Sequence, residues 1–401
     1  MAGCLKGDNA LAAAGQMKPR CKHRRLAGIV AVAAMTAGCA ASLPAGQAHR
    51  ALEGACTTLP IARPSAAGIS GQHPRPGLLP PGVVAVAAQS SSSAWVVGPH
   101  PTDVRPEKAV VAHWNGAAWT TFSPAGLPRL SSLRAVAAFP GGAWAVGESG
   151  LTDQGDGGGR PEHLIVRLTG TTMRRVPVPG PADGELEDVA ATSAANVWAV
   201  GYIGGVTGGL SLLLHWNGTA WKRTPLPAMV GRDGNAGDIV AVDATSTTNA
   251  WAVGNLPAIV HWNGRRWGQV VSPDIGTPYV FNDVAATSAR NVWAVGDGLD
   301  KQVVVILHWN GRRWTCALSP KVPFTYLVAV SASSADNAWA VGGTGDESLA
   351  LHWNGHSWKQ VITPQPGQVG SLDDVAFIPQ SGFVWAIGGR LLLHWNGTAW
   401  R

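Results

Sequence analysis

A seven-residue motif, His-Trp-Asn-Gly-x-x-Trp, restricts the fold of this chain more than any other feature. It occurs at His113–Trp119, His215–Trp221, His261–Trp267, His308–Trp314, His352–Trp358 and His394–Trp400. An eroded copy that keeps the glycine occupies Arg167–Met173. A second motif, of the form Asn-Val-Trp-Ala-Val-Gly, precedes each copy, and its tryptophans are Trp95, Trp144, Trp198, Trp251, Trp293, Trp339 and Trp385. All 19 tryptophans fall in these two motifs, so the chain is an array of seven similar units.

Each unit predicts four short antiparallel strands. Asn-Gly tolerates the positive φ angles of tight β turns, so the strands on either side of residues 217–220 should form a hairpin in which Trp216 faces Trp221. The earlier strands, such as Asp188–Ala191, are apolar on both faces, as a sheet between two neighbouring sheets requires. The tryptophans of the second motif are 42 to 54 residues apart, which is typical of propeller repeats. We therefore expect an all-β fold, a seven-bladed β-propeller with four antiparallel strands per blade, over residues 82–401.

The seventh unit has little of its fourth strand, because Arg401 directly follows its final tryptophan. An open outer edge would leave backbone groups unpaired. The range 55–63 contains Thr57-Thr58-Leu59-Pro60, which is similar to the fourth-strand exit at 315–320. We therefore expect residues 55–63 to supply an N-terminal strand that closes the last blade.

Residues 1–38 have the layout of a signal peptide. Lys18–Arg25 is positively charged, and Leu26–Ala37 is an apolar run too short to span a membrane as a mature helix. The run leads to Cys39 in a sequence that resembles a bacterial lipobox, in which the cysteine is lipidated. We expect translation to start at Met17 and the mature protein to be anchored to the outer side of the cell membrane through Cys39. Ordinary secretory cleavage nearby is the alternative, and it would give a secreted protein.

Residues 39–81 are rich in Ala, Pro, Gly and Ser and predict a tether between membrane and propeller. The chain carries a net charge of +6, but residues 1–38 hold six Lys/Arg and one acidic residue, which leaves +1 beyond them. This balance argues against a nucleic-acid partner. Cys56 and Cys316 follow Cys39, and although export permits a disulfide between them, we expect two unpaired thiols. The lipid anchor at Cys39 is the only membrane contact that we expect.

The units resemble the blades of bacterial secreted seven-bladed propellers of the WD40-like and Asp-box (BNR) kind. The resemblance rests on His215–Trp221, in which a glycine-containing turn precedes an aromatic residue, as in an Asp-box hairpin. The motif departs from the Asp-box by having Asn in place of Asp and His-Trp in place of Ser. It also lacks the Trp-Asp dipeptide of true WD repeats. The resemblance covers about residues 82–401 and implies a propeller architecture.

The sequence offers no catalytic or metal constellation. It contains no nucleophile elbow, phosphate loop or dinucleotide fingerprint, so we expect no catalytic residues and no cofactor. The repeated histidines cannot share a metal, because equivalent positions in different blades lie far apart whereas Zn²⁺ ligands lie about 2.0 Å from the ion. We expect each histidine to make a structural hydrogen bond. Asp188, Asp283 and Asp374 begin innermost strands and could place charge near the channel mouth, although solvated strand ends are the simpler interpretation.

The connections after the second strand vary most in length among the units, and rigid scaffolds place recognition in such loops. We expect them to bind another protein or a glycan, with candidate residues Glu148, Asp153, Asp156, Glu162, Tyr202, Asp297, Asp300 and Lys301. The alternative is a lectin-like or carbohydrate-active propeller that stacks sugars on tryptophans, with candidates Trp216, Trp221, Trp262 and Trp267. Filling of the blade interfaces is the competing interpretation of these rings. The sequence therefore predicts an exported binding or scaffold module, which we expect to be monomeric.

Overall fold

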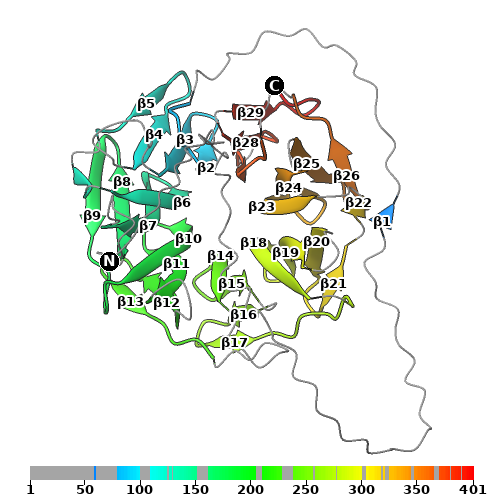
Figure 1. The fold of residues 1–401 in the computed structure, drawn as a ribbon, viewed down its shortest axis with the longest axis horizontal. Helices are drawn as coiled ribbons and strands as arrows, with labels where there is room; N and C mark the ends of the chain where they lie inside the picture. Colours follow the sequence, from blue (N-terminus) through cyan, green and yellow to red (C-terminus); the bar gives the residue numbers. More distant parts are fainter. Residues whose placement is uncertain are drawn as a thin grey trace, which may run out of the picture.

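The computed structural model of this chain is a ring of β-sheets around a central axis (Figure 1). It describes residues 58–59 and 79–401, apart from 100–108, 124–125, 129, 151–160, 205–209, 228–237, 256–257, 277, 300–303, 318, 321–324, 345–346, 365–369, 380 and 390. Seven antiparallel sheets form the blades, and a two-stranded parallel sheet lies outside them. The all-β, seven-bladed prediction is therefore confirmed. Within the described part, no helix is long and apolar enough to cross a membrane.

Each blade is a meander whose strands are hydrogen-bonded in sequence order. Blades one to three consist of β2 (Ala85–Ser90), β3 (Ser93–Gly98), β4 (Val110–Trp114), β5 (Trp119–Thr121); β6 (Ser132–Phe139), β7 (Gly142–Ser149), β8 (Glu162–Thr169), β9 (Thr172–Val176); and β10 (Gly184–Ser193), β11 (Asn196–Ile203), β12 (Leu210–Trp216), β13 (Trp221–Arg223). Blades four and five consist of β14 (Ile239–Ser246), β15 (Asn249–Gly254), β16 (Ile259–Trp262), β17 (Trp267–Gln269); and β18 (Tyr279–Ser288), β19 (Asn291–Gly298), β20 (Val304–Trp309), β21 (Trp314–Cys316). Blades six and seven consist of β23 (Tyr326–Ser334), β24 (Asn337–Gly343), β25 (Ser348–Trp353), β26 (Trp358–Val361); and β27 (Asp374–Phe377), β28 (Val384–Gly388), β29 (Leu391–Trp395).

The repeated motif forms the hairpin between the third and fourth strands. In blade three, Trp216 pairs directly with Trp221. The Oδ1 atom of Asn217 accepts hydrogen bonds from the backbone N–H groups of Thr219 (3.1 Å) and Ala220 (3.0 Å). Gly218 has a φ of 95°, a conformation that L-residues with a Cβ rarely adopt. The Asn-Gly pair therefore sets the turn, as the sequence predicted.

Tryptophans of the second motif join neighbouring blades. Trp198 on β11 is fully buried and stacks on His215 of its own blade, with ring centroids 4.1 Å apart. On its other side it meets Trp262 and Trp267 of blade four, both at 5.2 Å. Equivalent contacts recur around the ring, for example between Trp251 and Trp314 at 5.5 Å. Aromatic pairs at such distances add stabilisation beyond their buried area, so these tryptophans form the core between the blades.

The predicted closing strand does not pair with the seventh blade. β1 (Thr58–Leu59) pairs in parallel with β22 (Ser319–Pro320), which lies beside β26 at the rim (Figure 1). The prediction for 55–63 is therefore wrong at Thr58 and Leu59, and the rest of that range lies outside the described residues. The two segments of similar sequence pair with each other, because the edge of β22 is free to accept β1 as a parallel neighbour.

The seventh blade begins its fourth strand with its own last residues. Trp400 pairs with Trp395, and the backbones of Arg401 and His394 exchange two hydrogen bonds of 3.0 and 2.9 Å. Non-covalent contacts close the ring between blades seven and one, since the chain does not run directly from one to the other. Trp385 packs against Trp114 and Trp119 across this seam, at 5.9 and 5.4 Å.

Cys316, at the end of β21, is disulfide-bonded. The expectation of an unpaired thiol is therefore wrong at this residue. The backbone nearby explains why a bond is feasible, because β22 brings the N-terminal strand β1 to the same part of the rim. Cys56 and Cys39 lie outside the described residues.

The ring has two faces that differ in their connections. The loop face is the side of the ring where the second strands end, the third strands begin and one blade connects to the next. Glu148, Leu210 and Asp297 lie on it. We call turn face the opposite side, formed by the tight turns between first and second strands and between third and fourth strands. Gly218 and Arg290 belong to the turn face.

Candidate functional site

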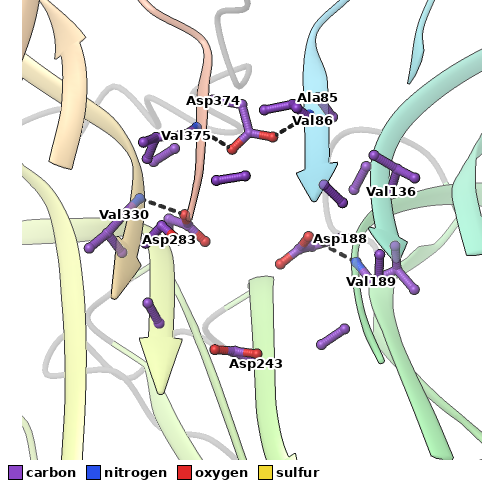
Figure 2. A pocket seen from close by; sticks show the side chains of 18 of the residues that line it. Ala85, Val86, Val136, Asp188, Val189, Asp243, Asp283, Val330, Asp374 and Val375 are labelled. Atoms are coloured by element: carbon purple, nitrogen blue, oxygen red, sulfur yellow. Dashed lines mark hydrogen bonds between the residues drawn. The ribbon is translucent and has the colours of Figure 1, made fainter. Parts of the chain in front are cut away.

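A cavity of about 300 Å³ runs along the axis of the ring, lined by the first strand of every blade (Figure 2). Alanine and valine side chains form much of its wall. Charged residues interrupt this apolar lining, among them Arg134, Glu187 and Asp373. The four further aspartates labelled in Figure 2 are Asp188, Asp243, Asp283 and Asp374. They come from blades three, four, five and seven. The channel is therefore acidic.

Each of these carboxylates joins its own strand to the first strand of the next blade. In blade three, the backbone N–H of Val189 donates to Asp188 Oδ1 and that of Val242 donates to Oδ2, both at 2.8 Å. The other acceptor–donor sets are Asp243 with Ala244 and Ala286 (2.7 and 2.7 Å), Asp283 with Val284 and Val330 (2.8 and 2.8 Å), and Asp374 with Val375 and Val86 (2.8 and 2.8 Å). The interpretation of Asp188, Asp283 and Asp374 as solvated strand ends is therefore wrong. They accept hydrogen bonds from backbone N–H groups of the first strands, which are edge strands with no neighbouring strand on the channel side.

Asp243 lies on β14 of blade four, next to the cavity. Burial raises its pKa to about 7, the hydrogen bonds from Ala286 and Ala244 oppose that rise, and the charge of Asp283 adds to it. Within the described residues, no group of three or more His, Cys, Asp or Glu side chains has the arrangement of a metal site. The hydrogen bonds to the first strand of the next blade make the four aspartates clamps between blades.

A second polar cluster lies at the loop-face mouth of the channel; we call it the mouth cluster and define it as Arg134, Glu148, Glu185, Glu187 and Tyr202. The Arg134 guanidinium donates to Glu148 at 2.6 and 3.1 Å and to Glu185 at 2.5 Å, and it lies 3.6 Å from Glu187. The Tyr202 hydroxyl is hydrogen-bonded to Glu185. One cation thus holds three carboxylates from blades two and three, which gives the cluster an acidic surplus.

Burial and charge shift the ionisation of the mouth cluster. Burial raises the pKa of Glu148 to about 7, against the lowering effect of Arg134 and with help from Glu185 and Glu187. Burial would lower the pKa of Arg134, but the three carboxylates outweigh it and raise that pKa. Burial also raises the pKa of Tyr202, and the Glu185 charge reinforces the rise. Such perturbed groups often mark functional sites, although structural ion-pair networks produce them as well.

The structure brings together two of the predicted loop residues, Glu148 and Tyr202, through the mouth cluster. Glu148 belongs to β7 and is only 3% exposed, so it supports the loops instead of contacting a partner. Asp297 accepts hydrogen bonds from the Asn282 side chain (2.6 Å) and the Leu327 N–H (3.1 Å). Exposed Glu162 lies 3.4 Å from Arg175. The remaining candidates, Asp153, Asp156, Asp300 and Lys301, lie outside the described residues.

The tryptophans proposed for sugar stacking line the blade interfaces. Trp216, Trp221 and Trp267 are 6%, 5% and 3% exposed, whereas Trp262 is half-buried. Trp216 and Trp221 both contact Trp144 of blade two, at 5.0 and 5.3 Å. A sugar needs an open ring face to stack, so the stacking prediction is wrong for the three buried rings. The competing interpretation, that these rings fill blade interfaces, is confirmed for them.

The repeated histidines make the expected structural hydrogen bonds. His215 Nε2 donates to Asn196 Oδ1 at 2.8 Å, and the Asn196 amide donates to Thr192 Oγ1 at 2.6 Å. The same His–Asn pair recurs at His261, His308 and His352. Burial lowers the pKa of each of these histidines. They are therefore neutral braces between the second and third strands.

Arg134, Glu185, Glu187 and Asp243 were missed as site residues. The signal was present, because each is a charged residue in a first strand that also carries buried apolar residues. Charged residues at such positions are rarely buried unless they are paired. The sequence does not give the distances between these residues, because they lie on strands of different blades.

No protein-family model matches this sequence, and no curated protein matches it. Solved propeller structures do. YCF48 from Cyanidioschyzon merolae matches with a TM-score of 0.53 and 18% identity, over 79% of this chain and 98% of that one. The WD40 propeller domain of Doa1 matches with a TM-score of 0.51 and 12% identity, over 78% and 92% of the two chains. The GH74 xyloglucanase from Xanthomonas campestris matches with a TM-score of 0.53 and 14% identity, over 78% and 52%.

Identities this low establish the fold alone. The chain is similar to seven-bladed and WD40 propellers, so this part of the expected resemblance is confirmed. The Asp-box relationship and a bacterial origin stay predictions.

Proposed function

We propose that this chain is an exported β-propeller that binds another protein through its loop face, held at the outer side of the cell membrane by lipidation of Cys39. One observation carries the binding proposal. The large hydrophobic side chains that are exposed in the described part all lie on the loop face: Leu210 (71%), Val271 (87%), Leu299 (47%) and Ile362 (55%). Single exposed apolar residues are ordinary, but their restriction to one face of a ring is not expected from folding alone.

The loop face also offers charge. Glu162 is exposed there, and the acidic surplus of the mouth cluster lies beside it at the channel entrance. Protein interfaces combine apolar contacts with a polar rim. A protein partner with apolar side chains and some positive charge fits this face better than a neutral one.

A protein is favoured over a glycan because the rings that would stack a sugar are mostly buried. Trp216, Trp221 and Trp267 would have to leave the blade interfaces to expose their faces, which would remove core contacts worth several kcal/mol each (about 3–5 for a buried Trp). Export and lipidation rest on the signal-like residues 1–38 and on the sequence around Cys39.

Site-specific photo-crosslinking in intact cells tests this proposal. A photoreactive amino acid replaces Leu210 or Val271 on the loop face, and matched variants carry it at exposed Thr219 or Thr398 on the turn face. We expect the same protein adduct from Leu210 and Val271 and its absence from Thr219 and Thr398. Equal adducts from both faces, or adducts from the turn face alone, would overturn the assignment. Binding in a glycan array that survives loop-face substitutions would favour a lectin instead.

A further inference from the structure

The two variable positions of the repeated motif are both arginine in two adjacent blades. Blade four carries Arg265 and Arg266 in its hairpin, and blade five carries Arg312 and Arg313 at the equivalent positions. The corresponding pair is Ala-Ala, Thr-Ala, His-Ser or Thr-Ala in the other intact copies. All four arginines are exposed. The residues that form the hairpin are therefore the same in all intact copies, whereas the two variable positions are both arginine in blades four and five alone.

The hairpin backbones hold these arginines in place. Asn263 Oδ1 accepts the N–H groups of Arg265 and Arg266, both at 3.1 Å. Asn310 Oδ1 does the same for Arg312 and Arg313, at 3.0 and 3.1 Å. The arginines therefore sit on preformed turns.

A fifth arginine joins the same sector. Arg290 lies in the turn between β18 and β19 of blade five and is exposed. Its side chain covers the neighbouring hairpin so closely that a Cβ built on Gly311 would lie 2.8 Å from its Cγ. In the described turns of the turn face, Asp336 of blade six is the one acidic residue. We call these five arginines the arginine sector.

Charge is segregated between the two faces. Among the described residues, the loop face carries Glu148, Glu162, Glu185, Glu187, Asp297 and Asp373, against Arg134, Arg223 and Arg175, the last of which pairs with Glu162. The turn face carries the arginine sector. An anionic surface would therefore attract one face of the ring and repel the other, which orients the molecule.

Two further features suit a lipid surface, the first of which recurs at Trp353 of blade six. Trp262 and Trp309 flank the arginine hairpins, are half-buried, and bond their indole N–H groups to backbone carbonyls of Thr247 (3.0 Å) and Ala289 (3.1 Å). Tryptophan with one end apolar and one end wet is favoured at membrane interfaces. The N-terminal strand β1 also joins the rim at β22, shortly after the fifth blade.

We propose that the arginine sector docks on an anionic lipid bilayer, so that the turn face lies against the membrane and the loop face points away from it. This inference rests on the proposed function only in placing the protein at a membrane. The twenty residues from Cys39 to Thr58 could extend to roughly 65 Å, so a tether alone leaves either face free to approach the lipid. The arginine sector supplies the missing orientation.

Vesicle co-sedimentation tests the docking without any partner protein. The probe is a vesicle of phosphatidylcholine with 30% phosphatidylglycerol (about one charged lipid in three, enough for a clear surface potential), compared with pure phosphatidylcholine. The protein starts at residue 39 with Cys39→Ser, which removes the acyl chain and retains every described residue. The test variant carries Arg265→Ser, Arg266→Ser, Arg312→Ser and Arg313→Ser. The control variant removes the same charge from the outer strands of blades two and three, through Arg174→Ser, Arg175→Ser, Lys222→Ser and Arg223→Ser.

Each basic residue near an anionic surface strengthens binding by roughly five-fold. We expect the test variant to lose at least about ten-fold in partitioning onto the anionic vesicles, and the control variant to lose much less. Binding should be absent on pure phosphatidylcholine and fall at high salt. Equal losses in both variants, or no preference of the parent for anionic vesicles, would overturn the docking. Retention on duplex DNA with no vesicle binding would show a nucleic-acid site instead. None of these outcomes bears on the crosslinks at Leu210, so a failure here is distinguishable from a failure of the loop-face proposal.

Discussion

The seam between blades seven and one should depend on one carboxylate. Asp374→Ala removes the acceptor of two backbone N–H groups, those of Val375 in its own strand and Val86 in the first blade, both 2.8 Å away. A hydrogen bond to a charged group contributes about 1.5–3 kcal/mol, and a donor left without a partner adds to the loss. The side chain is half-buried beside the cavity, where water can replace part of each bond. We therefore expect the free energy of unfolding to fall by about 2–4 kcal/mol.

Asp188→Ala is the matched control, because Asp188 holds the same two kinds of donor at the same distance of 2.8 Å. Its blades are also joined by the chain itself, which runs from β13 to β14, whereas the seam has no such link. Both variants should lose similar equilibrium stability in urea. Hydrogen exchange under native conditions should separate them, with amides of β2 and β27 exchanging faster only in Asp374→Ala. A loss below about 0.5 kcal/mol, or equal exchange of β2 in both variants, would refute the clamp.

Three further predictions concern other parts of the ring. The pKa of Glu148 is about 7 in the folded chain and near the ordinary value of 4.5 in the unfolded chain. The free energy of unfolding should therefore fall as pH rises between these values, by up to about 3 kcal/mol. Urea melts of Glu148→Gln, compared with the parent, should lack this part of the pH dependence. Trp251→Ala should lower the free energy of unfolding by about 3–5 kcal/mol, since Trp251 is 1% exposed and packs on two tryptophans of blade five. Thermal unfolding measures this loss, and a loss of only about 1 kcal/mol would contradict the role of the indole in the core. Non-reducing peptide mapping should find Cys316 linked to Cys56, and a free thiol at Cys56 would contradict this pairing.

The periodic part of the fold could be predicted from the sequence because it is local. Asn217 and Gly218 set their turn with hydrogen bonds inside four residues, and Trp216 then has to meet Trp221. The number of blades could be predicted in the same way, because each copy of the motif marks one hairpin and therefore one blade. The closing strand could not be predicted in this way, because which edge β1 meets depends on the position of β22, far along the chain.

The candidate site was less accessible for a related reason. Glu148 was expected in a variable loop, but β7 extends through Ser149 and draws Glu148 into the ion pair with Arg134. Asp243 lies two residues further along its strand than Asp188 does, as its pairing with Trp251 shows. The arginine pairs and their adjacent blades were predictable from the sequence, but the approach of Arg290 to the neighbouring hairpin at Gly311 follows only from the structure.

Hydroxyl-radical footprinting of the protein on intact cells, compared with the purified chain, tests most directly whether the loop face is the binding face. The method reads oxidation of side chains that are already present, so no substitution is required. We expect protection in cells at Leu210, Val271 and Ile362, which are 71%, 87% and 55% exposed in the isolated ring. Equal oxidation of these three side chains in both samples, or protection confined to the turn face and outer rim, would contradict the assignment of partner binding to the loop face.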